Sequence, residues 1–180
     1  MEVIMKVILL AKKDKPYIQE VVSYLTKHFD VEVHRGRAGD KFPRLGERDI
    51  LISYLSPWVI PQKELDKTKK WNINFHPGSS DYPGFGCYDF AILDKSKKYG
   101  ATAHIMEKKV DSGKIIGTSE FTMSESITVP GLMVKTYDIM YKLFLKVMGH
   151  IINYGKLPDC SRGWSREPYT MEDFDKEFGL

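Results

Sequence analysis

The first 76 residues alternate between short runs that favour β-strands and stretches with helical spacing. The strand-like runs cover residues 6–10, 31–34, 49–55 and 71–75, and they suit a parallel sheet that is covered on both faces. Pro16 offers a helix start, and apolar residues follow it at helical intervals: Ile18, Val21, Val22, Leu25 and Phe29. A second, short helix is expected over 62–70. Strands that alternate with helices predict an α/β fold, here a Rossmann-like, mostly parallel sheet with flanking helices.

The second half of the chain has a different pattern. Residues 76–86 hold three glycines and two prolines, which predicts a long loop. A helix is expected over 88–98, with strands over 101–106 and 114–121. From Leu132 onward, paired apolar residues follow one face of a long helix that ends at 153–155. We expect that face to pack on the sheet, and an interface in a homodimer is the alternative.

The bulk properties limit the classes of function. A net charge of +3 is below the basicity typical of nucleic-acid-binding proteins, and it fits a small anionic substrate equally well. Cys87 and Cys160 lie far apart and predict reduced thiols. No apolar run reaches the length of a membrane span, and the N-terminal run lacks a signal-peptide cleavage pattern. We therefore expect a cytoplasmic protein with no membrane partner, built as a globular domain (1–155) and an extended C-terminal arm (156–180).

Asn74 and His76 form the first candidate site. His76 closes a strand of the buried type, Pro77 and Gly78 follow it, and Asn74 lies two residues before it. Residues i and i+2 of a strand project from the same face, so both side chains point into one space. This space lies at the carboxyl edge of the sheet, where open α/β sheets bind their ligands. An amide donor beside an imidazole is suited to acyl transfer.

Other chemistries fit less well. Ser79 and Ser80 lie near His76, but the chain has no nucleophile elbow of a serine hydrolase. Ligands at the spacing of a zinc site are also missing, so no metal is expected. Cys87 is a candidate nucleophile, although a structural thiol is the preferred interpretation. The turn after the first strand, residues 11–14, has no glycine and so predicts no phosphate loop or dinucleotide site.

Three motifs resemble those of the folate-dependent formyltransferase superfamily, which includes glycinamide ribonucleotide, methionyl-tRNA and sugar-nucleotide formyltransferases. Residues 74–78 (Asn-Phe-His-Pro-Gly) resemble its Asn-x-His-Pro signature. Residues 100–106 and 110–116 resemble the next two family blocks, in the same order and at about the usual separation. The likeness covers residue 71 to about residue 116, and the long helix and segment 164–170 look like short bacterial sugar-type N-formyltransferases. The resemblance implies a formyltransferase fold with a shortened N-terminal half, and it makes 1–155 the catalytic domain.

The resemblance also implies roles for individual residues. Asn74, His76 and Asp111 become the catalytic residues: Asn74 donates to the oxyanion, His76 stabilises it and moves the proton, and Asp111 holds His76 and favours its charged form. 10-Formyltetrahydrofolate becomes the formyl donor, and a small amine becomes the acceptor. The implied pteridine contacts are Ser56, Pro57, Trp58, Val59, Ile60, Lys108, Lys109 and Val110. Thr102 and His104 are expected to support the catalytic residues, and acceptor contacts are expected at Lys12, Lys13, Pro77, Gly78 and Tyr82.

Departures from the family pattern bear on the acceptor. The glycine-rich phosphate loop of the glycinamide enzyme is absent, and no domain of the kind associated with tRNA binding follows the long helix. Neither a glycinamide ribonucleotide nor a tRNA is therefore expected as acceptor. Residues 79–84 replace the usual Leu-Leu-Pro, so the resemblance does not predict the shape of the acceptor pocket. The preferred function is N-formylation of an amino sugar carried on a nucleotide. A 10-formyltetrahydrofolate hydrolase and a catalytically silent folate- or nucleotide-binding module remain alternatives.

Overall fold

The computed structural model describes residues 4–179, so residues 1–3 and 180 of the expected domain and arm lie outside the described residues. Its centre is a six-stranded sheet with the order β2-β1-β3-β4-β5-β6. The strands are β1 (Lys6–Lys12), β2 (Asp30–Gly36), β3 (Ile50–Tyr54), β4 (Trp71–His76), β5 (Lys98–Ile105) and β6 (Ile115–Thr122). The helices are α1 (Ile18–Thr26), α2 (Gln62–Leu65), α3 (Cys87–Leu93), α4 (Val129–Tyr154) and α5 (Met171–Phe178).

The sheet is mixed. Strands β2, β1, β3 and β4 pair in parallel, β5 is antiparallel to β4, and β6 is antiparallel to β5. Five of the six strands therefore run in one direction, and the predicted α/β class with a mostly parallel sheet is confirmed. The helix expected over 88–98 is too long, because α3 ends at Leu93 and Lys98 already begins β5. Lys95 has a φ of 50°, and a residue in the left-handed region cannot continue a right-handed helix.

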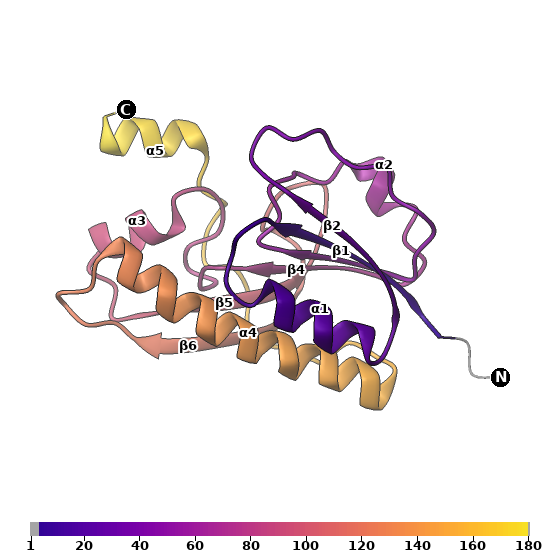
Figure 1. Ribbon diagram of the computed structural model, residues 1–180. Helices are drawn as coiled ribbons and strands as arrows, with labels where there is room; N and C mark the ends of the chain where they lie inside the picture. The colour runs from indigo at the N-terminus through magenta and orange to yellow at the C-terminus, as the bar shows by residue number, and fades with distance from the viewer. Residues whose placement is uncertain (1–3, 180) are drawn as a thin grey trace.

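Helices cover both faces of the sheet (Figure 1). Alternate residues of β1 divide between the two faces: Val7 and Leu9 join the large core under α1 and α4, whereas Ile8 and Leu10 pack with Leu65 of α2. Helix α4 begins at Val129, three residues before the predicted start, because the side chain of Thr128 caps it by accepting from the backbone N–H of Gly131. The expected packing of its apolar stripe on the sheet is confirmed by the buried members Leu132, Met140, Leu143, Phe144, Val147, Met148 and Ile151.

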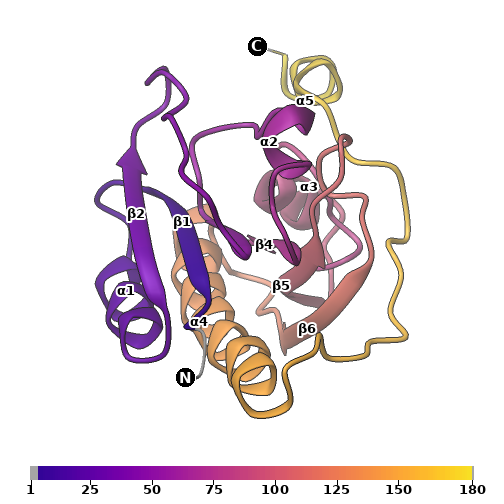
Figure 2. The same cartoon turned by 90° about the vertical axis from the view of Figure 1, so that its right-hand side faces the viewer.

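The C-terminal tail runs back past β5 and β6 toward α3 (Figure 2). Residues 156–170 lack helices and regular strands, whereas Met171–Phe178, which also belong to the expected arm, form α5. A capping box between Thr170 and Asp173 starts this helix, and the rings of Phe174 and Phe178 pack against Phe90 of α3. Across residues 4–179, the helices are too short or too polar to cross a lipid bilayer.

Candidate active site

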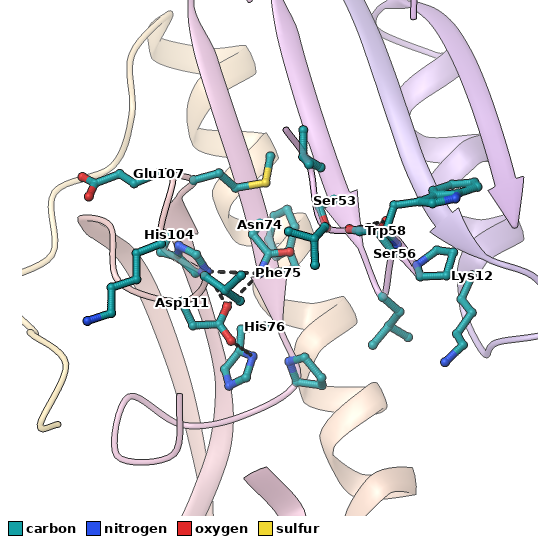
Figure 3. A pocket seen from close by; sticks show the side chains of 18 of the residues that line it. Lys12, Ser53, Ser56, Trp58, Asn74, Phe75, His76, His104, Glu107 and Asp111 are labelled. Carbon is teal, nitrogen blue, oxygen red and sulfur yellow. Dashed lines mark hydrogen bonds and ion pairs between the residues drawn. The ribbon is translucent and has the colours of Figure 1, made fainter. Parts of the chain in front are cut away.

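Asn74, His76 and Asp111 meet at the carboxyl edge of the sheet (Figure 3). The first two residues lie on β4, and Asp111 belongs to the turn between β5 and β6. Asp111 Oδ2 lies 3.1 Å from His76 Nδ1, and Asp111 Oδ1 lies 3.3 Å from Asn74 Nδ2. Two stretches of chain, separated by more than thirty residues, thus supply one compact group of an amide, an imidazole and a carboxylate.

Both ring nitrogens of His76 face oxygen atoms. Nδ1 faces the carboxylate of Asp111, and Nε2 lies 2.9 Å from the backbone carbonyl oxygen of Tyr82. An ionised carboxylate and a carbonyl only accept hydrogen bonds, so both bonds form when each nitrogen carries a proton. The geometry therefore favours an imidazolium ring beside an ionised Asp111. Gly78 lies against this ring, with no room for a Cβ between Nε2 of His76 and the Tyr82 carbonyl.

The carboxylate of Asp111 is buried, with 5% of the residue exposed. Besides its contacts with His76 and Asn74, it lies 3.1 Å from His104 Nε2 and accepts the Gly84 N–H at 2.9 Å. Burial by itself raises the pKa of the Asp111 carboxyl, but the charge of His76 and the hydrogen bonds from His104 and Gly84 outweigh it. They hold the pKa of Asp111 well below its usual range, so Asp111 is an anion at neutral pH.

Asp111 also has an unusual backbone. Its φ is 46°, in the left-handed region, which aspartate adopts more readily than most residues. Strain of this kind persists where the surrounding structure fixes a residue, and such residues cluster at functional sites. The turn thus holds the carboxylate in one orientation at some conformational cost.

Strand β5 supports the group from the side. The β4–β5 register places His104 opposite Asn74 and Thr102 opposite His76, and residues directly opposite each other project from the same face. A register shift between Ala103 and His104 in the β5–β6 pairing marks a bulge at this point, a feature that re-aims side chains. His104 reaches Asp111 itself, whereas the hydroxyl of Thr102 donates to the Gly78 carbonyl at 2.8 Å and so supports the loop under His76.

A cavity of about 430 Å³ opens beside these side chains and reaches both layers of the fold. The volume is within the usual range for small-molecule sites. On the side of α2, Trp58, Ile60, Leu65 and Met106 line the cavity, and on the other side Met133 and Tyr137 of α4 do so. The cavity is thus lined from both faces of the sheet, and Asn74 and His76 are among its lining residues.

The predicted pteridine contacts all line this cavity: Ser56, Pro57, Trp58, Val59, Ile60, Lys108, Lys109 and Val110. Trp58 is anchored from behind. Its indole fills the space above Gly36, and its Nε1 donates to the Asp40 carbonyl at 2.9 Å. Val59 and Val110 are exposed apolar residues at the cavity, 74% and 49% exposed. Lys109 forms an ion pair with Glu167 of the tail.

Only two of the five predicted acceptor contacts line the cavity. Lys12 and Pro77 line the cavity, whereas Lys13, Gly78 and Tyr82 do not. The Tyr82 side chain turns into the core next to α3, where its hydroxyl donates to Asp94 at 3.1 Å. Gly78 and Tyr82 instead touch the ring of His76, through a close backbone approach and a carbonyl oxygen.

Sequence reasoning missed several residues of the cavity. Lys15 follows the first strand and lies over the ring of Tyr137, 5.6 Å from its centroid. Met133 was assigned to the apolar stripe of α4, and Tyr137, four residues further along the same helix, was not singled out. The other lining residues that were missed are Ser53, Leu55, Leu65, Phe75, Tyr88, Met106 and Glu107. The backbone groups of Gly84 and Tyr82 had no sequence signal, because any residue offers an N–H or a carbonyl.

Cys87 is buried at the start of α3, with its Sγ 3.7 Å from the Pro77 carbonyl oxygen. Burial raises the pKa of this thiol to about 12. The thiolate needed for nucleophilic attack is therefore almost absent at neutral pH, and the preferred interpretation of a structural thiol holds.

Comparison with known proteins gives sequence relatives and structural neighbours, although no family model matches the chain. Methionyl-tRNA formyltransferases of Rickettsia massiliae and Rickettsia bellii are 25% and 26% identical over 118 and 120 residues. These matches cover 64% and 65% of this chain but only 38% and 39% of the relatives, so the chain spans well under half of their length.

Three solved structures illustrate the structural likeness. A 4-N formyltransferase from Francisella tularensis gives a TM-score of 0.77 at 20% identity, covering 96% of this chain and 78% of that one. PseJ from Anoxybacillus kamchatkensis, solved with a UDP-linked formamido sugar and tetrahydrofolate, gives 0.73 at 23% identity over 97% and 90%. An N-formyltransferase from Helicobacter canadensis, solved with folinic acid and dTDP-3-aminofucose, gives 0.72 at 19% identity over 95% and 72%. The chain has the formyltransferase fold, and the resemblance to that superfamily is confirmed.

Proposed function

We propose that this chain transfers a formyl group from 10-formyltetrahydrofolate to a small amine, with a nucleotide-linked amino sugar as the acceptor. The observation that carries the proposal is the convergence of Asn74, His76 and Asp111 at a cavity that is lined from both faces of the sheet. Formyl transfer needs two substrates to meet at one carbonyl carbon, and the two sets of lining residues offer each substrate its own contacts.

The transfer makes one bond and breaks another. The acceptor nitrogen bonds to the formyl carbon, the bond from that carbon to the folate nitrogen breaks, and the proton lost by the amine ends on the folate nitrogen. Negative charge develops on the formyl oxygen in between. Groups that stabilise this charge in a site that excludes water contribute most to the rate.

The three side chains divide this work. An amide nitrogen carries two N–H groups, so Asn74 can keep one for Asp111 and offer the other to the formyl oxygen. The imidazolium of His76 supplies a positive charge beside that oxygen. Its Nε2 proton moves only if the bond to the Tyr82 carbonyl opens. Asp111 orients the ring and balances its charge.

Two parts of the cavity suit the two substrates. The α2 side combines apolar walls, such as Ile60 and Met106, with the charge of Lys108, which fits a flat heteroaromatic ring attached to an anionic chain. The side toward α4 carries Lys15 over the ring of Tyr137, and Lys12 also lines the cavity. These two charges fit the phosphates of an anionic acceptor. Folates and nucleotide-linked amino sugars bound to proteins of the same fold support this assignment.

The proposal is tested with purified protein, 10-formyltetrahydrofolate and a panel of UDP- and dTDP-linked amino sugars. Tetrahydrofolate release is followed optically, and the gain of a formyl group by the acceptor is measured by mass spectrometry. We expect release that depends on one class of acceptor. Release without any amine would indicate a hydrolase, and binding without release would indicate a silent module; either result rejects the proposed transfer.

A lysine variant then tests the acceptor side. Lys15→Ala is expected to raise the KM for the acceptor about tenfold, because a charged hydrogen bond to a phosphate is lost, and to leave the KM for the folate unchanged. Lys69→Ala is the matched control, since Lys69 lies just before β4, at the opposite end of that strand, and pairs with Glu47. Equal effects of the two variants would remove Lys15 from the acceptor site.

A further inference from the structure

The C-terminal tail is attached to both loops that surround the catalytic carboxylate. We call residues 162–169 the strap. Near its start, the backbone N–H of Ser165 donates to the Ser80 carbonyl at 3.1 Å. At its end, the Tyr169 N–H donates to the Pro83 carbonyl at 2.9 Å, and the Phe85 N–H donates to the Tyr169 carbonyl at 2.9 Å. One residue before Ser165, Nε1 of Trp164 donates to the Gly113 carbonyl at 2.8 Å.

Two of these attachments lie next to Asp111. Gly113 is two residues beyond Asp111, in the same turn, so the indole of Trp164 holds that turn from outside. Tyr169 pairs with Gly84 in an isolated β-bridge, and the Gly84 N–H donates directly to Asp111 Oδ2. The strap therefore fixes both the peptide that carries the carboxylate and one of the donors that this carboxylate accepts.

The loop between β4 and α3 has a backbone conformation that allows close contact with the strap. Gly84 has a φ of +88°, a conformation in which a side chain is strained, and a Cβ there would collide with the backbone of Tyr169. Tyr169 is itself held, since its ring stacks on Phe90 with a centroid separation of 3.7 Å. A close backbone approach at a glycine, with a stacked ring beside it, is a specific attachment rather than loose packing of a tail.

Trp164 also contacts the imidazoles. Its ring centroid lies 5.1 Å from that of His104 and 6.0 Å from that of His76, both in edge-to-face geometry. The two histidines are 2% and 4% exposed. The indole thus forms part of the wall that keeps water from the rings, and a dry setting strengthens the ion pair between His76 and Asp111.

We propose that the strap positions Asp111 for catalysis and that Trp164 is its principal positioning residue. The kinetic consequences of this inference rest on the proposed function. Without the indole, the Gly113 carbonyl loses its donor, the strained turn at Asp111 gains freedom, and water reaches the imidazoles. Trp164 touches neither substrate in this account, so its loss lowers the rate and leaves substrate binding nearly intact.

The test compares three variants of the full chain. Trp164→Ala removes the ring and its N–H, Trp164→Phe keeps an aromatic ring without the N–H, and Trp71→Phe is the matched control at the other end of β4 from His76. We expect kcat to fall about a hundredfold in Trp164→Ala and about tenfold in Trp164→Phe, with each KM within about threefold of wild type, because small displacements of catalytic groups cost rates of this order. Trp71→Phe keeps the wild-type kcat.

Ring-nitrogen NMR of histidine-labelled protein gives a readout that needs no turnover. The wild type and Trp71→Phe are expected to carry protons on both nitrogens of His76, and Trp164→Ala is expected to lose this pattern. Unchanged nitrogen signals, or a kcat within about twofold of wild type in folded Trp164→Ala, would overturn the inference. If that variant does not fold, the same criteria apply to Trp164→Phe. If the wild type transfers no formyl group, the proposed function fails, and the nitrogen signals alone decide whether the strap holds the ion pair.

Discussion

Replacing Asp111 by Asn removes the negative charge at the centre of the site and leaves the size of the side chain nearly unchanged. In the native protein the two carboxylate oxygens face four donors or rings: His76 Nδ1, His104 Nε2, Asn74 Nδ2 and the Gly84 N–H. An asparagine side chain has one oxygen and one NH₂ group. Its NH₂ group would replace one of the two carboxylate oxygens and would then face the N–H of Asn74 or of Gly84, a donor opposite a donor. The imidazolium of His76 also loses its counter-charge.

The expected losses differ in size for activity and stability. We expect kcat to fall at least about a hundredfold, equivalent to about 2.7 kcal/mol of transition-state stabilisation, since the ring is neither oriented nor kept charged. The unfolding free energy is expected to fall by only about 1–3 kcal/mol, because an imidazole left without its counter-ion can release a proton, and the remaining cost is that of a buried, unpaired donor. For a chain of this size each kcal/mol lowers the Tm by about 2–4 °C.

The stability difference also has a predicted pH dependence. The pKa of Asp111 is lowered in the folded state, so its charge stabilises the protein above the unfolded carboxyl pKa of about 3.9. This contribution is lost as the pH falls through the lower, folded pKa. The contribution of Asp111 should therefore keep the margin of the wild type over Asp111→Asn from narrowing between pH 7 and about pH 4, and the margin should shrink only below that.

Urea unfolding between pH 3 and pH 7, together with the folate-release assay, measures both quantities. Asp138→Asn is the matched control. Asp138 is a half-exposed aspartate of α4 that also has a lowered pKa through Lys142, and exposed pairs contribute little. A margin that narrows already between pH 7 and pH 5, or a folded Asp111→Asn that turns over within about tenfold of wild type, would refute the role given to the carboxylate.

Three further predictions use the same assays. Asn74→Ala and His76→Ala should each lower kcat at least about a hundredfold while circular dichroism shows a folded chain, and a near-native rate in either variant would remove that residue from the mechanism. Gly84→Ala should cost about 2–4 kcal/mol in urea unfolding, because it adds a collision with the tail to an unfavourable φ. Gly39→Ala has nearly the same φ with open space around a Cβ and should cost about 1–2 kcal/mol, so equal losses would contradict the collision. Cys87 should resist iodoacetamide at pH 8 in the folded protein, as judged by mass spectrometry, and rapid labelling would contradict its raised pKa.

The sequence predicted the sheet well because its strands are buried on both faces and therefore read as apolar runs. The same rule could not give the direction of β5, because buried parallel and antiparallel strands have similar patterns. Helix ends were less accurate for local reasons, such as the left-handed Lys95 after α3 and the Thr128 cap before α4. The helix α5 was missed because Phe174 and Phe178 need Phe90, far away in the sequence, to form their apolar face.

The residues of the site also differ in how far the sequence predicts them. Asn74 and His76 were predictable from strand periodicity alone, since two residues apart on a strand means one face. Asp111 required the resemblance to a family, because nothing local says which strand edge its turn approaches. The Tyr82 carbonyl, the Gly84 N–H and the Trp164 indole were out of reach, since their roles come from chain segments that meet only in the folded protein.

The buried ion pair of the site is supported by several distant segments of the chain. The ion pair of His76 and Asp111 is buried, and a buried pair stabilises a fold only when further hydrogen bonds satisfy both partners. Here those bonds come from β5 through His104, from the loop after β4 through Gly84, and from the strap that holds this loop. A chain that had formed the sheet but not yet docked residues 162–169 would lack the attachments at Gly84 and Gly113, and its carboxylate would be wetter and less ordered. The arrangement of charges therefore depends on residues 162–169, although the charged residues themselves lie near the middle of the sequence.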